Sequence, residues 1–162
     1  MTVSLDQQDH RILALVQFDI RMSSAAIGDK VGLSATAVQR RLQRMRDAGV
    51  ITAEVAVIDP ALVGLPVSVI VEVDIARETG DDLDRFQNLM VTCDEVRQCW
   101  YTTGKVDFVL LVDAPDMTAY EAFTRRVLIN NDNVLSFTSL VVLDEIKNGP
   151  VVSIRSANST AD

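Results

Sequence analysis

A proline at position 60 divides the sequence into two halves with very different charge balance. Residues 1–59 contain seven basic and seven acidic side chains, whereas residues 60–162 contain eight basic and sixteen acidic ones and carry the whole net charge of −8. Proline lacks an amide proton and restricts the residue before it, so Asp59-Pro60 ends any regular element. We therefore predict a first domain over residues 1–58, a linker over 59–65, a second domain over 66–150 and a tail over 151–162.

The composition excludes several classes of function. The single histidine, His10, leaves almost nothing for a zinc site or a catalytic triad, and no phosphate-binding glycine motif is present. We therefore expect no enzyme, no catalytic residues, no metal ligands and no cofactor. The first residues lack the basic stretch and apolar run of a signal peptide, and no apolar segment approaches membrane-spanning length. A cytoplasmic protein without a membrane partner is expected.

Three short helices are predicted in the first half from apolar spacing and from residues that cap helix ends. Serine and aspartate side chains satisfy the free amides at a helix start, and glycine permits the left-handed turn at its end. The predicted limits are Ser4, with Gln7 as its capping-box partner, to about residue 18; Ser23 or Ser24 to Gly32; and Ser34 to Ala48-Gly49.

Two further features of the first half have structural consequences. Gly28 occupies a close-packing position usually filled by alanine, and glycine within a helix costs about 1 kcal/mol. Residues 50–58 then place Ile51, Val55 and Val57 on one alternating face. This alternation predicts a strand that would form the wing of a DNA-binding domain.

The third predicted helix separates an apolar face from a basic one. At 100° per residue, Val38, Leu42 and Met45 share one side and polar residues point away from it. Arginines and side-chain amides bridge phosphates and read base edges in a major groove, although an arginine-rich face also occurs as plain solvated surface. Two short helices joined by a glycine turn form the helix-turn-helix arrangement. The candidate DNA-binding residues are Arg21, Ser23, Ser34, Thr36, Gln39, Arg40, Gln43 and Arg44.

The second half alternates strands and helices in the order βαββαβ, which is the ferredoxin-like arrangement. The fold class is therefore α+β, with an N-terminal winged helix-turn-helix followed by a C-terminal ferredoxin-like domain. The predicted elements are a strand over 67–75, a helix opening at Gly80-Asp81-Asp82, strands over 96–103 and 107–113 joined at Gly104-Lys105, a helix after Pro115 with Met117, Tyr120, Phe123 and Val127 facing the core, and a strand over 134–143.

Short motifs run through both halves in a fixed order. They are Leu5-Asp6-x-x-Asp9, Asp19-Ile20-Arg21-Met22-Ser23, Val31-Gly32-Leu33-Ser34, Arg40-Arg41-Leu42 through Ala48-Gly49-Val50-Ile51, Ile58-Asp59-Pro60, Val96 through Phe108 with Cys99-Trp100-Tyr101-Thr102-Thr103-Gly104 and Asp107, and Leu143-x-x-Ile146-Lys147. In these residues, and in their spacing, the chain resembles the Lrp/AsnC family of feast/famine transcriptional regulators.

The resemblance implies a sequence-specific transcriptional regulator whose partners are double-stranded operator DNA, copies of itself and an amino-acid effector. In that family the second domain forms dimers through its sheets, assembles further into tetramers or octamers, and binds the effector at an interface between dimers. Gly104 would let backbone approach the ligand, and Asp107 would offer its carboxylate to an ammonium group. The candidate effector-binding residues are Thr103, Gly104, Lys105, Asp107 and Ser139.

Two alternatives remain open at this point. Gly104 also suits a plain hairpin turn, and Asp107 suits the cap of such a turn. Phe137 stands where the family commonly has a small hydroxyl residue, so beside Ser139 it would shrink or close an effector pocket. The alternative function is an architectural DNA-binding protein that senses no small molecule.

Overall fold

The computed structural model of the chain describes residues 4–77, 79–147, 149 and 151–154. Contacts between residues divide the described chain into two compact units, one within residues 58–147 and the other formed by the described residues up to 57 together with 149 and 151–154, and each has its own hydrophobic core. Residues 151–154, expected in a separate tail, belong to the first unit, where the amide of Val152 donates to Oε1 of Gln17 at 3.2 Å. The rest of that expected tail lies outside the described residues.

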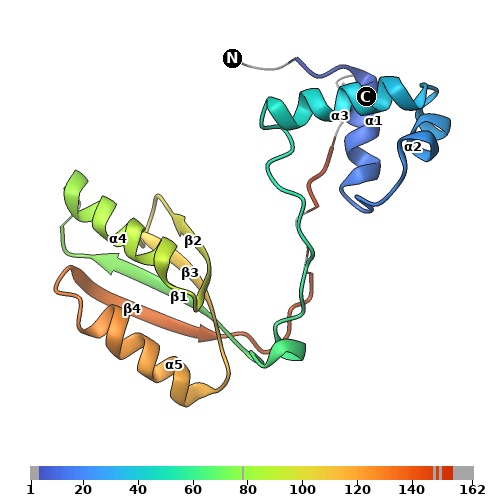
Figure 1. Ribbon diagram of the computed structural model, residues 1–162. Coiled ribbons are helices and arrows are strands. Elements are labelled where there is room, and N and C mark those ends of the chain that lie inside the picture. Colours follow the sequence, from blue (N-terminus) through green and yellow to red (C-terminus); the bar gives the residue numbers. More distant parts are fainter. Residues whose placement is uncertain (1–3, 78, 148, 150, 155–162) are drawn as a thin grey trace, which may run out of the picture. The chain divides into compact units, whose positions relative to one another are not determined.

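The first unit contains three helices, α1 (Gln7–Val16), α2 (Ser24–Val31) and α3 (Ala35–Asp47) (Figure 1). The two serine caps are as predicted, since the hydroxyl oxygens of Ser23 and Ser34 accept amide protons of α2 and α3. Gly32 ends α2 with φ of 75°. The buried core contains residues from all three helices, namely Ile12, Val16, Ile27, Val31, Val38, Leu42 and Met45.

The predicted cap of α1 was wrong by two residues. The carboxylate of Asp6, not the hydroxyl of Ser4, accepts the amide proton of Asp9 at 2.9 Å. The carboxylate of Asp9 in turn accepts the amide proton of Asp6 at 3.0 Å. This reciprocal arrangement satisfies two free amides and places negative charge at the positive end of the helix, which a serine hydroxyl does not do.

The predicted wing strand over residues 50–58 is not formed, although the structure describes all of these residues. Ile51 packs against the helical core, but Val55 and Val57 are exposed. A strand is stable only when its backbone pairs with a neighbour. The apolar residues of this segment alternate, but the segment pairs with no described strand of this chain and therefore forms no strand itself.

Gly28 is required by backbone packing, although alanine usually fills this position and glycine costs helix stability. Its carbonyl oxygen accepts the amide protons of Gly32 at 2.8 Å and Leu33 at 3.0 Å, which draws the following turn against α2. A Cβ atom at residue 28 would press on the carbonyl oxygen of Leu33, closer than van der Waals contact permits. Glycine is therefore the residue that allows α2 and the turn to approach this closely.

The second unit is a four-stranded antiparallel sheet with two helices, in the predicted order βαββαβ. The elements are β1 (Val67–Ile75), α4 (Gly80–Thr92), β2 (Val96–Tyr101), β3 (Phe108–Ala114), α5 (Met117–Thr124), which continues as a π-helix over Arg125–Ile129, and β4 (Val134–Val141). The strands lie in the order β2-β3-β1-β4, and a short 3₁₀ turn, Ala61–Val63, precedes them.

Both helices cover the same face of the sheet, because residues of α4 and α5 share one buried cluster with alternate strand residues. Val71 of β1 lies opposite Leu110 of β3 on this face, whereas Ile70 lies opposite Leu111 on the other. Tyr120, Phe123 and Val127 are buried as predicted, but Met117 is half exposed. It is the first residue of α5 and stands before the buried face of the helix begins.

The described chain contains no helix that is both long enough and apolar enough to cross a membrane. The longest helices, α3 and α4, have 13 residues each, and a span needs about 20.

We expect Gly28→Ala to lower the thermal unfolding midpoint of the first unit. The added methyl group meets backbone, and such overpacking costs about 1–3 kcal/mol, against a gain in helix propensity of about 1 kcal/mol. Circular dichroism during heating measures the midpoint. Gly80→Ala is the control, because Gly80 opens α4 with free space around it. A midpoint for Gly28→Ala at or above that of the unaltered protein would contradict the close approach.

Candidate functional site

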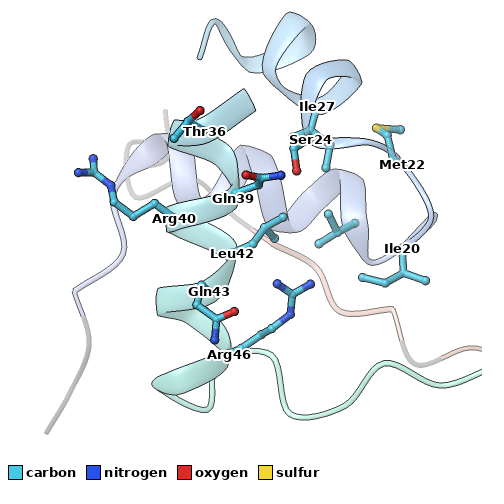
Figure 2. A pocket seen from close by; sticks show the side chains of 11 residues that line it. Ile20, Met22, Ser24, Ile27, Thr36, Gln39, Arg40, Leu42, Gln43 and Arg46 are labelled. Carbon is cyan, nitrogen blue, oxygen red and sulfur yellow. The ribbon is translucent and has the colours of Figure 1, made fainter. Parts of the chain in front are cut away.

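The outward face of α3 lines a hollow of about 550 Å³ in the first unit (Figure 2). On one side, α3 contributes exposed polar side chains. The turn between α1 and α2 and the start of α2 form the other side and give the hollow a partly apolar lining. The lining residues are Val16, Ile20, Met22, Ser24, Ile27, Thr36, Gln39, Arg40, Leu42, Gln43 and Arg46. Four of the predicted DNA-binding residues, Thr36, Gln39, Arg40 and Gln43, therefore share one surface.

The remaining predicted residues have local partners. Ser23 and Ser34 are the capping residues of α2 and α3, so their hydroxyl oxygens are engaged by backbone amides at 3.2 Å. Arg21 is almost fully exposed, with Asp19 at 3.7 Å. The side-chain amide of Gln43, although it borders the hollow, donates to Asp47 at 2.7 Å, one turn further along α3.

The four arginines of α3 differ in what they contact. The guanidinium of Arg40 makes no hydrogen bond or ion pair with any described residue, and its side chain is exposed. Arg44 was predicted to point outward like Arg40, but its guanidinium pairs with the carboxylate of Asp9, and its side chain is only half exposed. Arg44 therefore stabilises the contact between α1 and α3, a role that a helical wheel of α3 alone does not show.

Asp9 lies at the centre of an ion-pair cluster that is otherwise partly exposed. Its side chain is fully buried and pairs with Arg41 at 2.8 Å as well as with Arg44. Asp6 also pairs with Arg41, at 2.6 Å. The amide of Asp9 and the Arg41 guanidinium hold the pKa of Asp6 below its ordinary value. The two carboxylates in turn raise the pKa of Arg41, Asp6 through the stronger hydrogen bond.

Arg46, Ile20 and Met22 are among the lining residues that the predicted DNA-binding set did not include. Arg46 pairs with Glu54 and borders the hollow. Its position about 80° from Val38 on a helical wheel was the available signal. Ile20 and Met22, in the turn before α2, gave no periodic signal because they lie outside any helix.

The predicted effector residues fall into two separate places. Thr103, Gly104 and Lys105 are exposed in the loop that joins β2 to β3, and Gly104 has φ of 131°, which favours glycine. The carboxylate of Asp107 accepts the amide proton of Ile75 at 2.8 Å, and its own amide donates to the carbonyl of Val73 at 3.1 Å. Asp107 thus attaches the loop to the end of β1.

Ser139 is not brought to that loop. It lies on β4, which β1 separates from β3, and its hydroxyl forms a hydrogen bond with the hydroxyl of Tyr120 on α5. Burial raises the pKa of Tyr120. Phe137, on the same face of β4, packs against the hydrophobic core. Within one chain these two residues therefore belong to the packing between β4 and α5.

No group of three or more histidine, cysteine or acidic side chains is placed to hold a metal ion among the residues that the structure describes.

A helix-turn-helix unit with polar and basic side chains on the outward face of its second helix is the architecture of a class of DNA-binding proteins. Residues 5–46 match the family model of the AsnC-type helix-turn-helix domain, and residues 68–152 match that of the Lrp/AsnC ligand binding domain. The chain belongs to the Lrp/AsnC family of transcriptional regulators, as its sequence motifs suggested. The members of this family are regulators and not enzymes.

Similar proteins support the same assignment. An uncharacterised HTH-type transcriptional regulator of Sinorhizobium fredii is 45% identical over 145 residues, covering 90% of this chain and 86% of the relative. The DNA-binding transcriptional activator DecR of Escherichia coli is 29% identical over 143 residues, covering 88% and 94%.

Two solved structures have the same fold along nearly the whole chain. An AsnC family regulator from Agrobacterium tumefaciens superimposes with a TM-score of 0.85 at 33% identity, covering 91% of this chain and 96% of that one. A regulator from Neisseria meningitidis, solved as a complex with L-Met, gives a TM-score of 0.85 at 30% identity, covering 92% and 96%.

We expect Arg41→Ala to destabilise the first unit and Arg40→Ala to leave its stability nearly unchanged. The first change leaves the buried Asp9 with a single guanidinium partner, at a cost of about 1–3 kcal/mol. The second removes an exposed side chain without an ion pair, an effect within about 0.5 kcal/mol. Urea unfolding followed by circular dichroism compares them. Equal midpoints for the two variants would show that the Asp9 cluster contributes little.

Proposed function

We propose that this chain is a sequence-specific DNA-binding transcriptional regulator that inserts α3 into the major groove of its operator. The observation that carries the proposal is the shared surface of Thr36, Gln39, Arg40 and Gln43 around the hollow beside α3. Amide side chains pair with adenine edges, and arginine pairs with guanine or with phosphate. The hydrophobic face of the same helix is buried, which keeps these side chains directed outward.

The charge distribution supports this use of the first unit. A chain of net charge −8 is repelled by DNA at long range, but the excess negative charge lies after residue 59. The first half is neutral and carries four of its seven basic side chains on α3. Screening over about 8–10 Å at ordinary salt concentrations then permits the basic helix to approach the duplex.

The uncovered face of the sheet supports self-association of the second unit. Ile70, Trp100 and Leu140 are large apolar residues of this face, and each exposes more than a third of its surface. A hollow of about 280 Å³ opens among Ile70, Trp100 and Leu111. We propose that a second copy covers this face. A two-fold dimer would present its recognition helices to half-sites about 34 Å apart, and further association would give tetramers or octamers.

An amino acid is the effector class that we propose, bound where the β2–β3 loops of associated copies meet. The exposed loop from Thr103 to Lys105, attached to β1 by Asp107, offers backbone amides, an ammonium group and a hydroxyl at one place. These groups suit the carboxylate and ammonium of an amino acid. The Neisseria meningitidis relative was solved with L-Met, which supports the class but not the individual ligand.

We expect Arg40→Ala to weaken operator binding about ten- to hundredfold while leaving folding and assembly unchanged. The loss corresponds to one base or phosphate contact of about 1–3 kcal/mol. Fluorescence anisotropy measures it, with an operator selected from a random duplex library by the unaltered protein.

Arg85→Ala is the matched control, since it removes the same charge from an exposed position of α4. If Arg40→Ala binds the selected operator as tightly as Arg85→Ala does, α3 does not read DNA through this face.

We also expect one or more amino acids to change the operator affinity or the molar mass of the protein, and Gly104→Val to reduce that response. A β-branched residue is strained at φ of 131° and displaces the loop. A panel of the twenty amino acids, read by anisotropy and by light scattering, tests this. Gly80→Ala serves as the control in the same unit. An unaltered protein that binds DNA but ignores the whole panel would instead support the architectural alternative.

A further inference from the structure

Three of the four arginines on α3 are already paired with carboxylates of the same unit. Arg41 contacts Asp6 and Asp9, Arg44 contacts Asp9, and Arg46 contacts Glu54. Arg40 alone has no such partner among the described residues. The recognition helix therefore offers DNA far less free positive charge than its sequence suggests.

These ion pairs differ in how much free energy it costs to separate the arginine from its carboxylate. Glu54 and Arg46 are both partly exposed, so water replaces either partner at little cost. Asp9 is fully buried, and a buried carboxylate that loses its cations has no water to replace them. Releasing Arg41 or Arg44 to a DNA phosphate is consequently much less favourable than releasing Arg46.

The positions of these ion pairs determine which arginines of α3 are available to DNA. A carboxylate accepts the same forked pair of N–H groups that a phosphate accepts, so the two compete for one guanidinium. Asp9 lies on α1, and it draws Arg41 and Arg44 toward that helix. The outward surface of α3 is left with Arg40, with the weakly held Arg46 and with the amides of Gln39 and Gln43.

We propose that Asp9 is a positioning residue that limits how many phosphates the helix-turn-helix neutralises. By limiting these contacts, Asp9 raises the fraction of the binding free energy that comes from base contacts. It also lowers the affinity for DNA of any sequence. The inference rests on the proposed function, because it concerns how the same α3 surface meets DNA. Phosphate contacts dominate non-specific binding, so a domain with few of them discriminates better between sequences.

The test compares the salt dependence of binding to a random-sequence duplex, which requires no knowledge of the operator. Asp9→Asn keeps an acceptor for the amide of Asp6 but removes the charge that holds the two arginines. The logarithm of the binding constant falls against the logarithm of salt concentration with a slope of about −0.9 per neutralised phosphate. We expect Asp9→Asn to steepen this slope by about 1 to 2 per DNA-binding unit.

In practical terms, each additional phosphate that the variant neutralises makes its affinity fall about three- to fourfold further between about 50 and 200 mM salt. We also expect the ratio of operator affinity to random-duplex affinity to decrease at the lower salt concentration. A residue with a purely structural role would change the folded fraction without changing the slope measured on the folded protein.

Asp29→Asn is the matched control, because it makes the same change of charge at an exposed position of α2 where no described arginine pairs with the carboxylate. We expect its slope to equal that of the unaltered protein. If folded Asp9→Asn has the slope of Asp29→Asn, the proposal is wrong.

Arg44→Ala decides the question should Asp9→Asn fail to fold. Asp9 keeps Arg41 as a partner in this variant, and an arginine that Asp9 already holds neutralises no phosphate in the unaltered protein. We expect the slope of Arg44→Ala to equal that of the unaltered protein, and a slope shallower by about 0.9 would overturn the proposal. If the unaltered protein binds neither a selected operator nor the random duplex, the proposed function itself fails.

Discussion

The packing of the first unit depends on one buried negative charge, the carboxylate of Asp9. A buried carboxylate is tolerated only when cations and donors surround it, and here the donors are two arginines of α3 and the amide of Asp6. Because the arginines lie about one turn apart on α3, they restrict how that helix turns about its axis against α1. The apolar core of Val38, Leu42 and Met45 then fits one orientation, and the opposite face of α3 remains outside.

The elements whose ends are determined locally were predictable from the sequence. Ser23, Gly32 and Ser34 satisfy or permit backbone groups within their own turns, so their roles require no knowledge of distant residues. The same holds for β1, whose alternate residues face the core. The order of strands and helices in the second half followed from these local signals.

Features that depend on distant partners were not predictable. Arg44 has the same local pattern as Arg40, and only the position of Asp9, 35 residues earlier, separates them. Apolar side chains alternate along residues 50–58 as they do in a strand. Such alternation shows which side chains share a face, but it does not provide a neighbouring strand with which the backbone can pair. Serine and aspartate both cap helices, and the reciprocal bond with Asp9 selected Asp6 over Ser4. The candidate effector residues could not be placed from the sequence for the same reason. Asp107 binds the amide of Ile75, whereas Ser139 contacts Tyr120 elsewhere on the sheet. A site that contains both would need another copy of the chain.

The close approach at Gly28 has a consequence for chimeric regulators, in which a recognition helix from one relative replaces that of another. Here the carbonyl of Leu33 lies against the Cα of Gly28. A recognition helix grafted from Ser34 onward would therefore follow a turn whose geometry requires glycine at residue 28. A relative with alanine at the equivalent position would need a wider turn, and a graft that joins the two within residues 28–33 would misalign α3. The exchange point therefore belongs before residue 28.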